Sequence, residues 1–296
     1  MQHLDVTKSK SVLGMGKKHF KHSDPSSTDY LKRSLLSGDS SFAAKEAYKA
    51  ARTNLLFTRV DEGCQILAFT STSQGEGKTV NCCNLALSVA ENGQKVLIID
   101  ADLRRPKIAQ MFGLHNGSGL SEFLAGMSAP GADGSIGQIP LIKTKYPNLS
   151  VILSGHIPPN PAELLASNRL KLLLDTASQH FDYIFIDTPP ISMVTDAAVL
   201  SKNVKGYVFV VRAGVTPLEI LRDVVLKMEQ LDANILGFLL NDLDAKSGSY
   251  KYKGYRGYGK YRGYGKYRGY GKYDNHSYGK KRDEYAMGST DEQPEE

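Results

Sequence analysis

A glycine-rich loop between an apolar run and a helical stretch constrains this chain of 296 residues more than any other feature. Residues 72–79 read TSQGEGKT, directly after the apolar run 65–70 and at the start of the stretch 79–91, which has the spacing of a helix. The loop matches the P-loop pattern except at its first position, where Thr72 stands in place of glycine. Strand, loop and helix in this order predict a site for the phosphates of a nucleotide.

The residue types of this loop suit a nucleotide bound with Mg²⁺. Gly75 and Gly77 let main-chain N–H groups turn toward phosphate oxygens, and the helix N-terminus adds a partial positive charge. Lys78 can reach the β- and γ-phosphates, and the hydroxyl of Thr79 can ligate Mg²⁺. Together with Glu76, these residues are the cofactor-binding candidates of the loop. The alternative is a glycine-rich turn in which the Lys-Thr pair occurs by chance. It does not explain why a predicted strand precedes the loop and a predicted helix follows it.

Short apolar runs alternate with helical stretches over the middle of the chain. The runs are continuous, which is typical of strands buried on both faces of a parallel sheet. They cover residues 65–70, 95–100, 149–153, 183–187, 207–211 and 235–240, and helices are expected over 79–91, 161–178 and 217–231. The sequence therefore predicts an α/β fold of the P-loop NTPase type, with a doubly wound, mostly parallel sheet and helices on both faces.

Three aspartates stand at the ends of predicted strands. Asp100 ends one run, Asp102 follows two residues later, and Asp187 ends another run. Ligands of an open parallel sheet bind beyond the carboxyl ends of its strands, so the three carboxylates can converge on one Mg-nucleotide beside the P-loop. A single aspartate at such a place would more simply be a cap or a turn former, and only the three together favour a site.

Composition divides the chain into three regions. Residues 1–40 are predicted to be a flexible arm, residues 41–245 the folded domain, and residues 246–296 a disordered tail. Most of the net charge of +6 lies in the last region, which holds 12 Lys and Arg against 7 Asp and Glu. No apolar run approaches the roughly 18–20 residues of a membrane-spanning helix, and the three cysteines build no disulfide framework. We therefore expect a cytoplasmic protein and exclude a secreted or integral membrane one.

Tyrosine is concentrated in the tail, where the hexapeptide RGYGKY occurs three times over residues 256–273. Eleven of the 16 tyrosines lie between positions 250 and 285. Glycine at this density opposes helix formation, and almost no aliphatic residues are present to build a core. A tail without a role, a nucleic-acid arm and a cluster of phosphoacceptors are the alternatives. The phosphoacceptor candidates are Tyr252, Tyr255, Tyr258, Tyr261, Tyr264, Tyr267, Tyr270 and Tyr273.

In these features the chain resembles a known family, the bacterial tyrosine kinases (BY-kinases) that govern capsule and exopolysaccharide synthesis. The likeness rests on the P-loop followed by two motifs, hydrophobic-Asp-x-Asp-x-Arg at Asp100 and hydrophobic-Asp-x-x-Pro at Asp187, and on the stretch 154–167. Ser73 stands where the related partitioning and division-site ATPases carry a signature lysine, which argues against their dimer mechanism. The resemblance implies a kinase that uses ATP and Mg²⁺ to phosphorylate its own tail tyrosines, and it makes nucleic acid an unlikely partner.

The resemblance also gives the site residues their expected roles. We expect Lys78 to neutralise the β- and γ-phosphates and Asp100 to accept the proton of the tyrosine hydroxyl. Thr79, Asp102 and Asp187 are the candidates for holding Mg²⁺. The sequence alone does not divide the base and metal roles among the three aspartates, so Lys78 and all three aspartates are catalytic candidates.

The segment 46–52 resembles the family's oligomerisation motif Glu-x-x-Arg-x-x-Arg, with Lys49 in place of the first arginine. The spacing of Glu46, Lys49 and Arg52 puts their charges along one helical face, where an ordinary solvated surface is the alternative. The motif implies a homo-oligomer, a ring in which subunits phosphorylate one another's tails. The family further implies a membrane-anchored activator protein, whose cytoplasmic segment recruits the kinase to the inner face of the membrane, and a tyrosine phosphatase.

Two points stay open in the sequence. Asn241 follows the last predicted strand at a position that resembles one where relatives contact adenine, and a plain turn residue fits it equally well. The competing interpretation of the whole chain is a nucleotide-switched ATPase of the partitioning or positioning type, with the basic tail as a binding arm.

Overall fold

The computed structural model describes residues 28–58, 62–127, 138–191 and 196–243. The chain divides into two compact units, Met1–Asp244 and Ala245–Glu296, and every described residue belongs to the first. The candidate phosphoacceptors from Tyr252 to Tyr273 and the first part of the predicted arm lie outside the described residues. Within the described ranges, no helix is long and apolar enough to cross a membrane.

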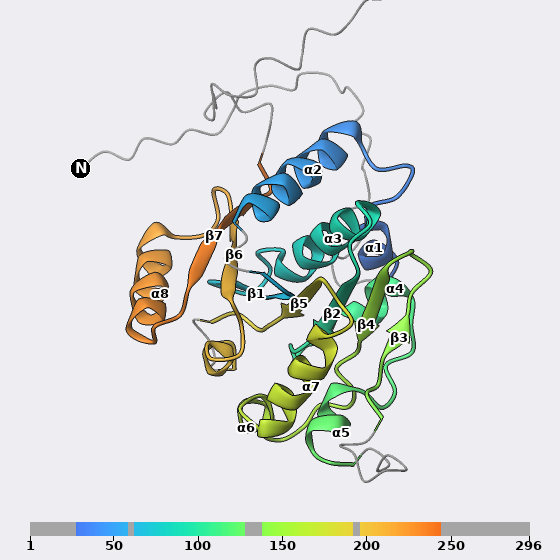
Figure 1. Ribbon diagram of the computed structural model, residues 1–296. Helices are drawn as coiled ribbons and strands as arrows, with labels where there is room; N and C mark the ends of the chain where they lie inside the picture. Colours follow the sequence, from blue (N-terminus) through green and yellow to red (C-terminus); the bar gives the residue numbers. More distant parts are fainter. Residues whose placement is uncertain (1–27, 59–61, 128–137, 192–195, 244–296) are drawn as a thin grey trace, which may run out of the picture. The chain divides into compact units, whose positions relative to one another are not determined.

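A seven-stranded sheet forms the centre of the first unit, with the strand order β3-β4-β2-β5-β1-β6-β7 (Figure 1). All neighbouring strands are parallel except β3 and β4, which pair antiparallel. The strands are β1 (Gln65–Ser71), β2 (Val96–Asp100), β3 (Ile142–Lys143), β4 (Leu149–Ile152), β5 (Tyr183–Asp187), β6 (Gly206–Arg212) and β7 (Ile235–Asn241). The six predicted strands and the mostly parallel P-loop NTPase fold are confirmed, and only the two-residue β3 was not predicted.

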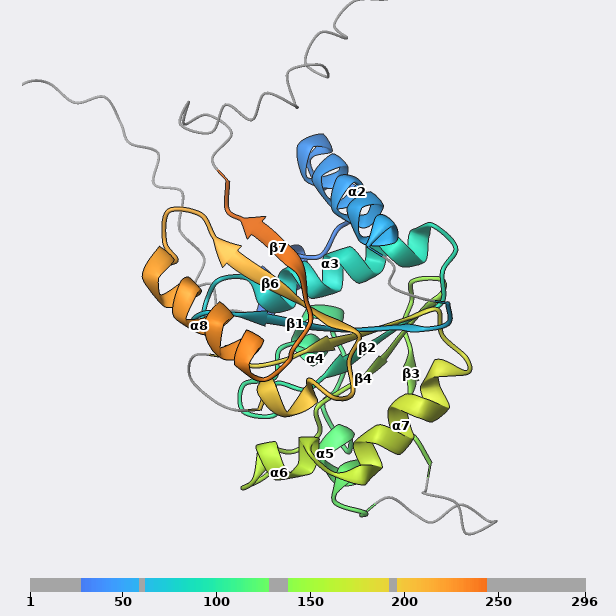
Figure 2. The same ribbon diagram turned by 60° about the vertical axis from the view of Figure 1, so that its left-hand side comes forward.

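Helices cover both faces of the sheet, as Figures 1 and 2 show from two sides. Successive side chains of a strand point to opposite faces of the sheet. In β2, Val96 and Ile98 belong to one core cluster, and Leu97 and Ile99 belong to another. The first cluster includes α1 (Thr28–Arg33), α2 (Phe42–Phe57), α3 (Lys78–Glu91) and α4 (Ile108–Phe112). The opposite face carries α5 (Leu120–Leu124), α6 (Pro161–Leu165), α7 (Asn168–Ser178), η1 (Ala198–Leu200) and α8 (Leu218–Gln230).

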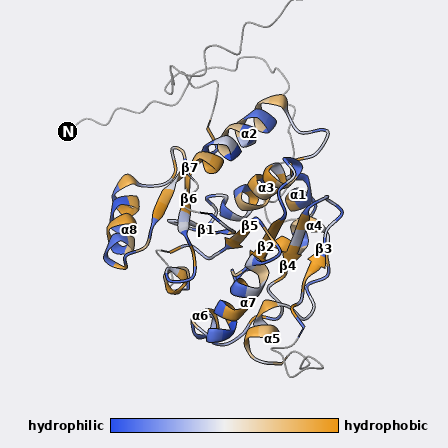
Figure 3. Cartoon of the chain, viewed as in Figure 1, coloured by the Kyte–Doolittle hydropathy of each residue, from blue (hydrophilic) through white to orange (hydrophobic). Residues whose placement is uncertain are grey.

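The distribution of hydropathy explains this layering (Figure 3). The strands are largely hydrophobic because both of their faces are covered, and every residue of β2 and β5 is buried. The longer helices combine hydrophobic and hydrophilic residues; α8, for example, buries Val224 and Met228 against the sheet. The predicted helix over 161–178 is divided into α6 and α7, with Ser167 in an extended conformation between them.

The structure differs from the sequence prediction at the start of the folded unit. Residues 28–40 were expected to belong to a flexible arm, but they form α1 and a turn that packs on the first core cluster. Leu31 and Leu35 lie four residues apart and are both buried. The polar composition of the surrounding sequence conceals this pair, which is enough to anchor the segment to the domain.

Candidate active site

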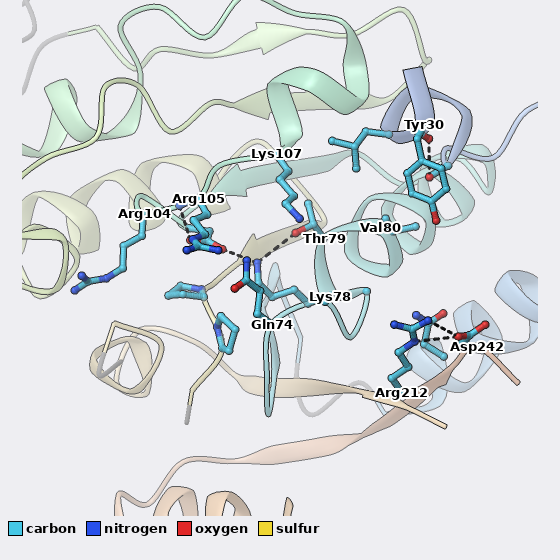
Figure 4. A pocket seen from close by; sticks show the side chains of 18 residues that line it. Tyr30, Gln74, Lys78, Thr79, Val80, Arg104, Arg105, Lys107, Arg212 and Asp242 are labelled. Carbon is cyan, nitrogen blue, oxygen red and sulfur yellow. Dashed lines mark hydrogen bonds and ion pairs between the residues drawn. The ribbon is translucent and has the colours of Figure 1, made fainter. Parts of the chain in front are cut away.

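A cavity of about 430 Å³ lies at the carboxyl ends of the strands (Figure 4), and the predicted site residues that line it are Gly75, Gly77, Lys78, Thr79, Asp102 and Asn241. Its walls come from the P-loop, from the segments after β2, β5 and β7, from the end of β6 and from α1. The lining residues are Tyr30, Leu31, Ser34, Gln74, Gly75, Gly77, Lys78, Thr79, Val80, Asp102, Arg104, Arg105, Lys107, Pro189, Pro190, Arg212, Asn241 and Asp242.

The P-loop has the backbone that its two glycines allow. Gly75 and Gly77 have φ angles of 82° and 94°, in the left-handed region that disfavours a side chain. Gly77 is the N-cap of α3, which begins at Lys78. This arrangement aims the N-terminus of a 14-residue helix at the cavity, where its partial positive charge favours phosphate.

Lys78, Thr79, Asp102 and Asp187 form one connected cluster, as the sequence predicts. Lys78 Nζ lies 2.8 Å from Asp102 Oδ2 and 3.3 Å from Asp187 Oδ2. The Thr79 hydroxyl donates to Asp187 Oδ2 over 2.7 Å. Burial would lower the pKa of Lys78, but the carboxylates of Asp187 and Asp102 outweigh it and raise that pKa above the ordinary lysine value. Lys78 is therefore a permanent cation in the cavity.

This cluster suits Mg²⁺ only as part of a nucleotide complex. Among the described residues, no group of three or more His, Cys, Asp or Glu side chains is arranged to hold a metal ion by itself. Magnesium in nucleotide sites keeps several waters and is bound through one or two carboxylates together with phosphate oxygens. The hydroxyl of Thr79 and the carboxylates of Asp187 and Asp102 are a donor set of this kind.

Asp100 differs from the role expected for it. Its carboxyl group is almost completely buried and does not line the cavity. Oδ2 accepts the N–H of Ile108 over 3.1 Å, and Oδ1 has no hydrogen-bond partner in the described part of the chain. Burial, and then the charge of Asp187, raise the pKa of Asp100 well above the usual aspartate value. Asp102 lines the cavity, whereas Asp100 does not.

The side chain of Glu76 turns away from the cavity. Oε2 accepts the N–H of Thr72 over 2.9 Å, and Oε1 accepts the Thr216 hydroxyl over 2.7 Å. The carboxylate is buried between the P-loop and the β6–α8 connection. Charge alone gives the reason, since a carboxylate facing the phosphates would repel them. The side chain of Glu76 therefore stabilises the loop.

Two asparagine amides hold the carbonyl groups of the P-loop. Asn241 Nδ2 donates to the Glu76 oxygen, and Asn81 Nδ2 donates to the Gly77 oxygen, both over 2.9 Å. Asn81 Oδ1 in turn accepts the Tyr48 hydroxyl of α2 over 2.9 Å. Sequence reasoning singled out Asn241 and missed Asn81 and Tyr48, because no local motif signals a contact between α2 and α3.

Basic side chains surround the acidic cluster. Arg104 makes a two-point ion pair with the buried Asp196, with N–O distances of 2.7 and 3.1 Å, so its direction is fixed by the protein. Arg105 and Lys107 line the cavity on the same segment. Arg212 pairs with Asp242 over 2.8 Å on another wall.

The three candidate oligomerisation residues do not share one free surface. Glu46 and Lys49 pair with each other over 2.8 Å on α2. Arg52 turns to α3 instead, where its guanidinium donates to the Ser88 oxygen over 2.8 Å. An assembly through α2 would therefore meet Glu46 and Lys49 directly, whereas Arg52 already stabilises the single domain.

Known proteins resemble this chain in sequence and in structure. Residues 64–229 match a family model described as an AAA domain. The tyrosine-protein kinase CpsD of Streptococcus agalactiae is 36% identical over 217 residues, which cover 73% of this chain and 90% of CpsD. Tyrosine-protein kinase Etk of Escherichia coli K12 is 36% identical over 211 residues, but the chain spans only 28% of its length.

A solved structure agrees with these relatives. The kinase domain of Escherichia coli tyrosine kinase ETK is 36% identical, superposes with a TM-score of 0.63, and the match covers 71% of this chain and 80% of that domain. The shared fold includes the sheet whose strand ends carry the cluster of Lys78, Asp102 and Asp187. The chain belongs to the family of bacterial protein-tyrosine kinases built on a P-loop nucleotide-binding fold.

Proposed function

We propose that this kinase transfers the γ-phosphoryl group of ATP to the tail tyrosines between Tyr252 and Tyr273, and that a neighbouring copy of the chain supplies the tail. The observation that supports the proposal is that Lys78, Thr79 and Asp102 line one P-loop cavity and that the buried Asp187 contacts Lys78 and Thr79 directly behind it. A transfer of this kind depends on positioning and charge neutralisation rather than on covalent chemistry of the protein. The four side chains supply both.

Each side chain has one part in the transfer. Lys78 exchanges its carboxylate partners for the β- and γ-phosphate oxygens and neutralises the charge that moves between them. Thr79 and Asp187 would hold Mg²⁺, which would supply positive charge that stabilises the transferring phosphoryl group. The bond between the γ-phosphorus and the β–γ bridging oxygen breaks, and a bond from the tyrosine oxygen to that phosphorus forms. Asp102 accepts the tyrosine proton, because its carboxylate lines the cavity and that of Asp100 does not.

The charge of the tail gives phosphorylation a direct consequence. Residues 246–296 carry 12 Lys and Arg against 7 Asp and Glu, and each phosphotyrosine adds about −1.5 to −2. Eight modified tyrosines would therefore reverse the sign of the tail's charge. Tails with the same strong negative charge repel one another, so phosphorylation loosens an assembly of subunits.

The remaining family properties are also proposals for this chain. We propose that it regulates capsule or exopolysaccharide synthesis and export, and that a membrane-anchored activator recruits it to the inner face of the membrane. A tyrosine phosphatase would reset the tail. Glu46 and Lys49 on α2 are the surface residues that we propose for contact between subunits in a ring.

The proposal is tested by mass spectrometry of the full chain after incubation with MgATP. Phosphate on the tail is expected in the wild type and not in Lys78→Met. To test transfer between chains, Lys78→Met is mixed with an active chain whose eight candidate tyrosines are phenylalanine. Label on the Lys78→Met tail supports transfer between copies, whereas its absence from this mixture, with label in the wild type, means transfer within one chain. ATP hydrolysis without any phosphotyrosine would overturn the proposal in favour of a nucleotide-switched ATPase.

A further inference from the structure

Helix α1 packs firmly against the domain beside the nucleotide cavity. Leu31 and Leu35 are buried in the core cluster that α3 and α4 share. Asn84 of α3 holds the turn after the helix at two points, because its Oδ1 accepts the Leu36 N–H and its Nδ2 donates to the Ser34 oxygen, both over 2.8 Å. Side chains of α1 that reach the cavity are therefore held in place.

Tyr30 is the aromatic side chain that α1 brings to this cavity. It lines the wall together with Leu31 and Ser34, and Val80 in the first turn of α3 lines the same cavity (Figure 4). The residue is 42% exposed and lines the cavity, so a ligand there can reach it. On another wall, Arg212 and Asp242 form an exposed ion pair.

The acidic cluster gives the direction in which a nucleotide must lie. Lys78 and Asp102 mark the end of the cavity that receives the γ-phosphate, and Arg105 follows on the same side. In Figure 4, Arg104 and Arg105 lie at one end, and Tyr30, Arg212 and Asp242 lie at the other. With its γ-phosphate beside the carboxylates, a nucleotide directs its nucleoside toward the end that holds Tyr30.

We propose that Tyr30 forms an aromatic wall for the nucleoside of the bound nucleotide, so that α1 is part of the nucleotide site. The flat ring offers apolar contact to a base or ribose, and a base stacks on an aromatic ring because both have π-faces. Arg212 and Asp242 leave a charged edge on the other wall, which suits the polar rim of a base. This inference rests on the proposed ATP-dependent function and adds a residue to its binding site.

Binding of MgADP to the full chain tests the inference without any phosphoryl transfer. Tyr30→Ala is expected to raise the dissociation constant about tenfold, in the range of a lost base–aromatic contact. Tyr30→Phe keeps the ring and is expected to stay within about twofold of the wild type. Magnesium tripolyphosphate lacks a nucleoside, and its dissociation constant can be measured by competition with a fluorescent ADP. Once the different ADP affinities are taken into account, this constant should be the same for the wild type and Tyr30→Ala.

The matched control is Tyr146→Ala, which removes a ring that packs edge-on against Phe112 and does not line the cavity. It should leave MgADP affinity unchanged, and thermal melting shows whether each variant is folded. Unchanged MgADP affinity in Tyr30→Ala, equal weakening of tripolyphosphate, or an equal loss in Tyr30→Phe would each overturn the inference. If the wild type itself does not bind MgADP, the proposed function fails first, so the two failures are distinguishable.

Discussion

The side-chain nitrogen of Asn241 donates a hydrogen bond to the main-chain oxygen of Glu76 over 2.9 Å, joining the end of the last strand to the P-loop. The same amide lies so close to Gly77 that a Cβ atom there would overlap it. Asn241 and Glu76 are 165 positions apart in the chain, so this hydrogen bond to the phosphate loop forms only when the sheet is assembled. This contact makes the absence of a side chain at Gly77 as necessary as its backbone conformation.

Replacing the two P-loop glycines by alanine should separate these two requirements. Both have positive φ angles, which cost a residue with a Cβ about 1–2 kcal/mol, but only Gly77 has neighbours within 4 Å of the added atom. Gly77→Ala is therefore expected to weaken MgADP binding at least several-fold more than Gly75→Ala. Calorimetric titration measures the difference. Adding Asn241→Ala to Gly77→Ala should remove the overlap and so reduce the loss in the free energy of unfolding that Gly77→Ala causes. Equal effects of Gly75→Ala and Gly77→Ala on MgADP binding would contradict the steric argument.

Glu76 is expected to act on the loop through stability rather than through contact with phosphate. Glu76→Ala removes the carboxylate that accepts the buried Thr72 N–H and the Thr216 hydroxyl, which should cost about 1–3 kcal/mol in the free energy of unfolding. Glu76→Gln keeps one acceptor oxygen and should lose less. Urea denaturation measures both, with Glu91→Ala at the exposed end of α3 as the control. If Glu76→Ala weakened MgADP binding with no loss of stability, a direct role at the phosphates would be the better account.

Lys78 should stabilise the protein as well as serve catalysis. Its ammonium group neutralises Asp102 and Asp187, and Lys78→Met leaves these buried carboxylates without their cation. Removing one partner of a buried ion pair costs about 3–5 kcal/mol. We expect urea denaturation of Lys78→Met to show a loss of that order in EDTA and a smaller loss in millimolar Mg²⁺, which can replace the missing charge.

The exposed Lys171 on α7 gives the control, because Lys171→Met should leave the free energy of unfolding unchanged in both buffers. A Lys78→Met variant as stable as the wild type in EDTA would mean that the carboxylates become protonated at little cost.

Local patterns were sufficient to predict most of the sheet and the meeting of Lys78, Asp102 and Asp187. Continuous apolar runs marked six strands, and the motif spacing placed Lys78, Asp102 and Asp187 at neighbouring strand ends, where the parallel topology brings them together. Helix α1 was not predicted, since only a few apolar residues, among them the buried Leu31 and Leu35, distinguish this segment from a polar arm. Such a short segment becomes ordered only when a partner surface is already present.

The roles that sequence reasoning missed depend on where a side chain points. Asp100 and Asp102 look equivalent in the sequence, but the first faces the core and the second faces the cavity, because the strand ends between them. Arg52 has the spacing of an interface residue, yet its guanidinium binds the Ser88 oxygen of its own chain. Contacts of this kind join residues distant in sequence, and no spacing rule encodes them.

Lys49 and Arg52 should therefore respond differently to substitution. Lys49→Ala removes a surface ion pair with Glu46 and should cost less than about 1 kcal/mol in the free energy of unfolding. Arg52→Ala removes a charged donor from a buried main-chain oxygen and should cost about 1–2 kcal/mol. Measuring urea denaturation beside sedimentation velocity separates the effects. Loss of assembly in Lys49→Ala with normal stability would support the proposed interface, and unchanged sedimentation would contradict it.

Glu122, which does not line the nucleotide cavity, makes the free energy of unfolding depend on pH. Its carboxylate accepts the Gly119 N–H over 2.7 Å and the His156 N–H over 3.1 Å, and it contacts His156 Nδ1. Partial burial alone would raise the pKa of Glu122, but these hydrogen bonds together lower it from 4.5 to about 2. The stability that this charged group contributes is thus present above about pH 4.5 and is lost as the pH falls toward 2.

Glu122→Gln should therefore be less stable than the wild type at pH 7, by about 1–2 kcal/mol for the weakened charged hydrogen bonds. The difference should shrink when the free energy of unfolding is measured by urea denaturation at pH 3.5, because Glu122 is then mostly protonated in the unfolded wild type but still charged in the folded one, which favours unfolding. Glu219→Gln, at an exposed position of α8, should show no difference at either pH. A Glu122→Gln deficit that stayed constant or grew on acidification would mean that packing of the side chain, rather than its charge, stabilises the turn.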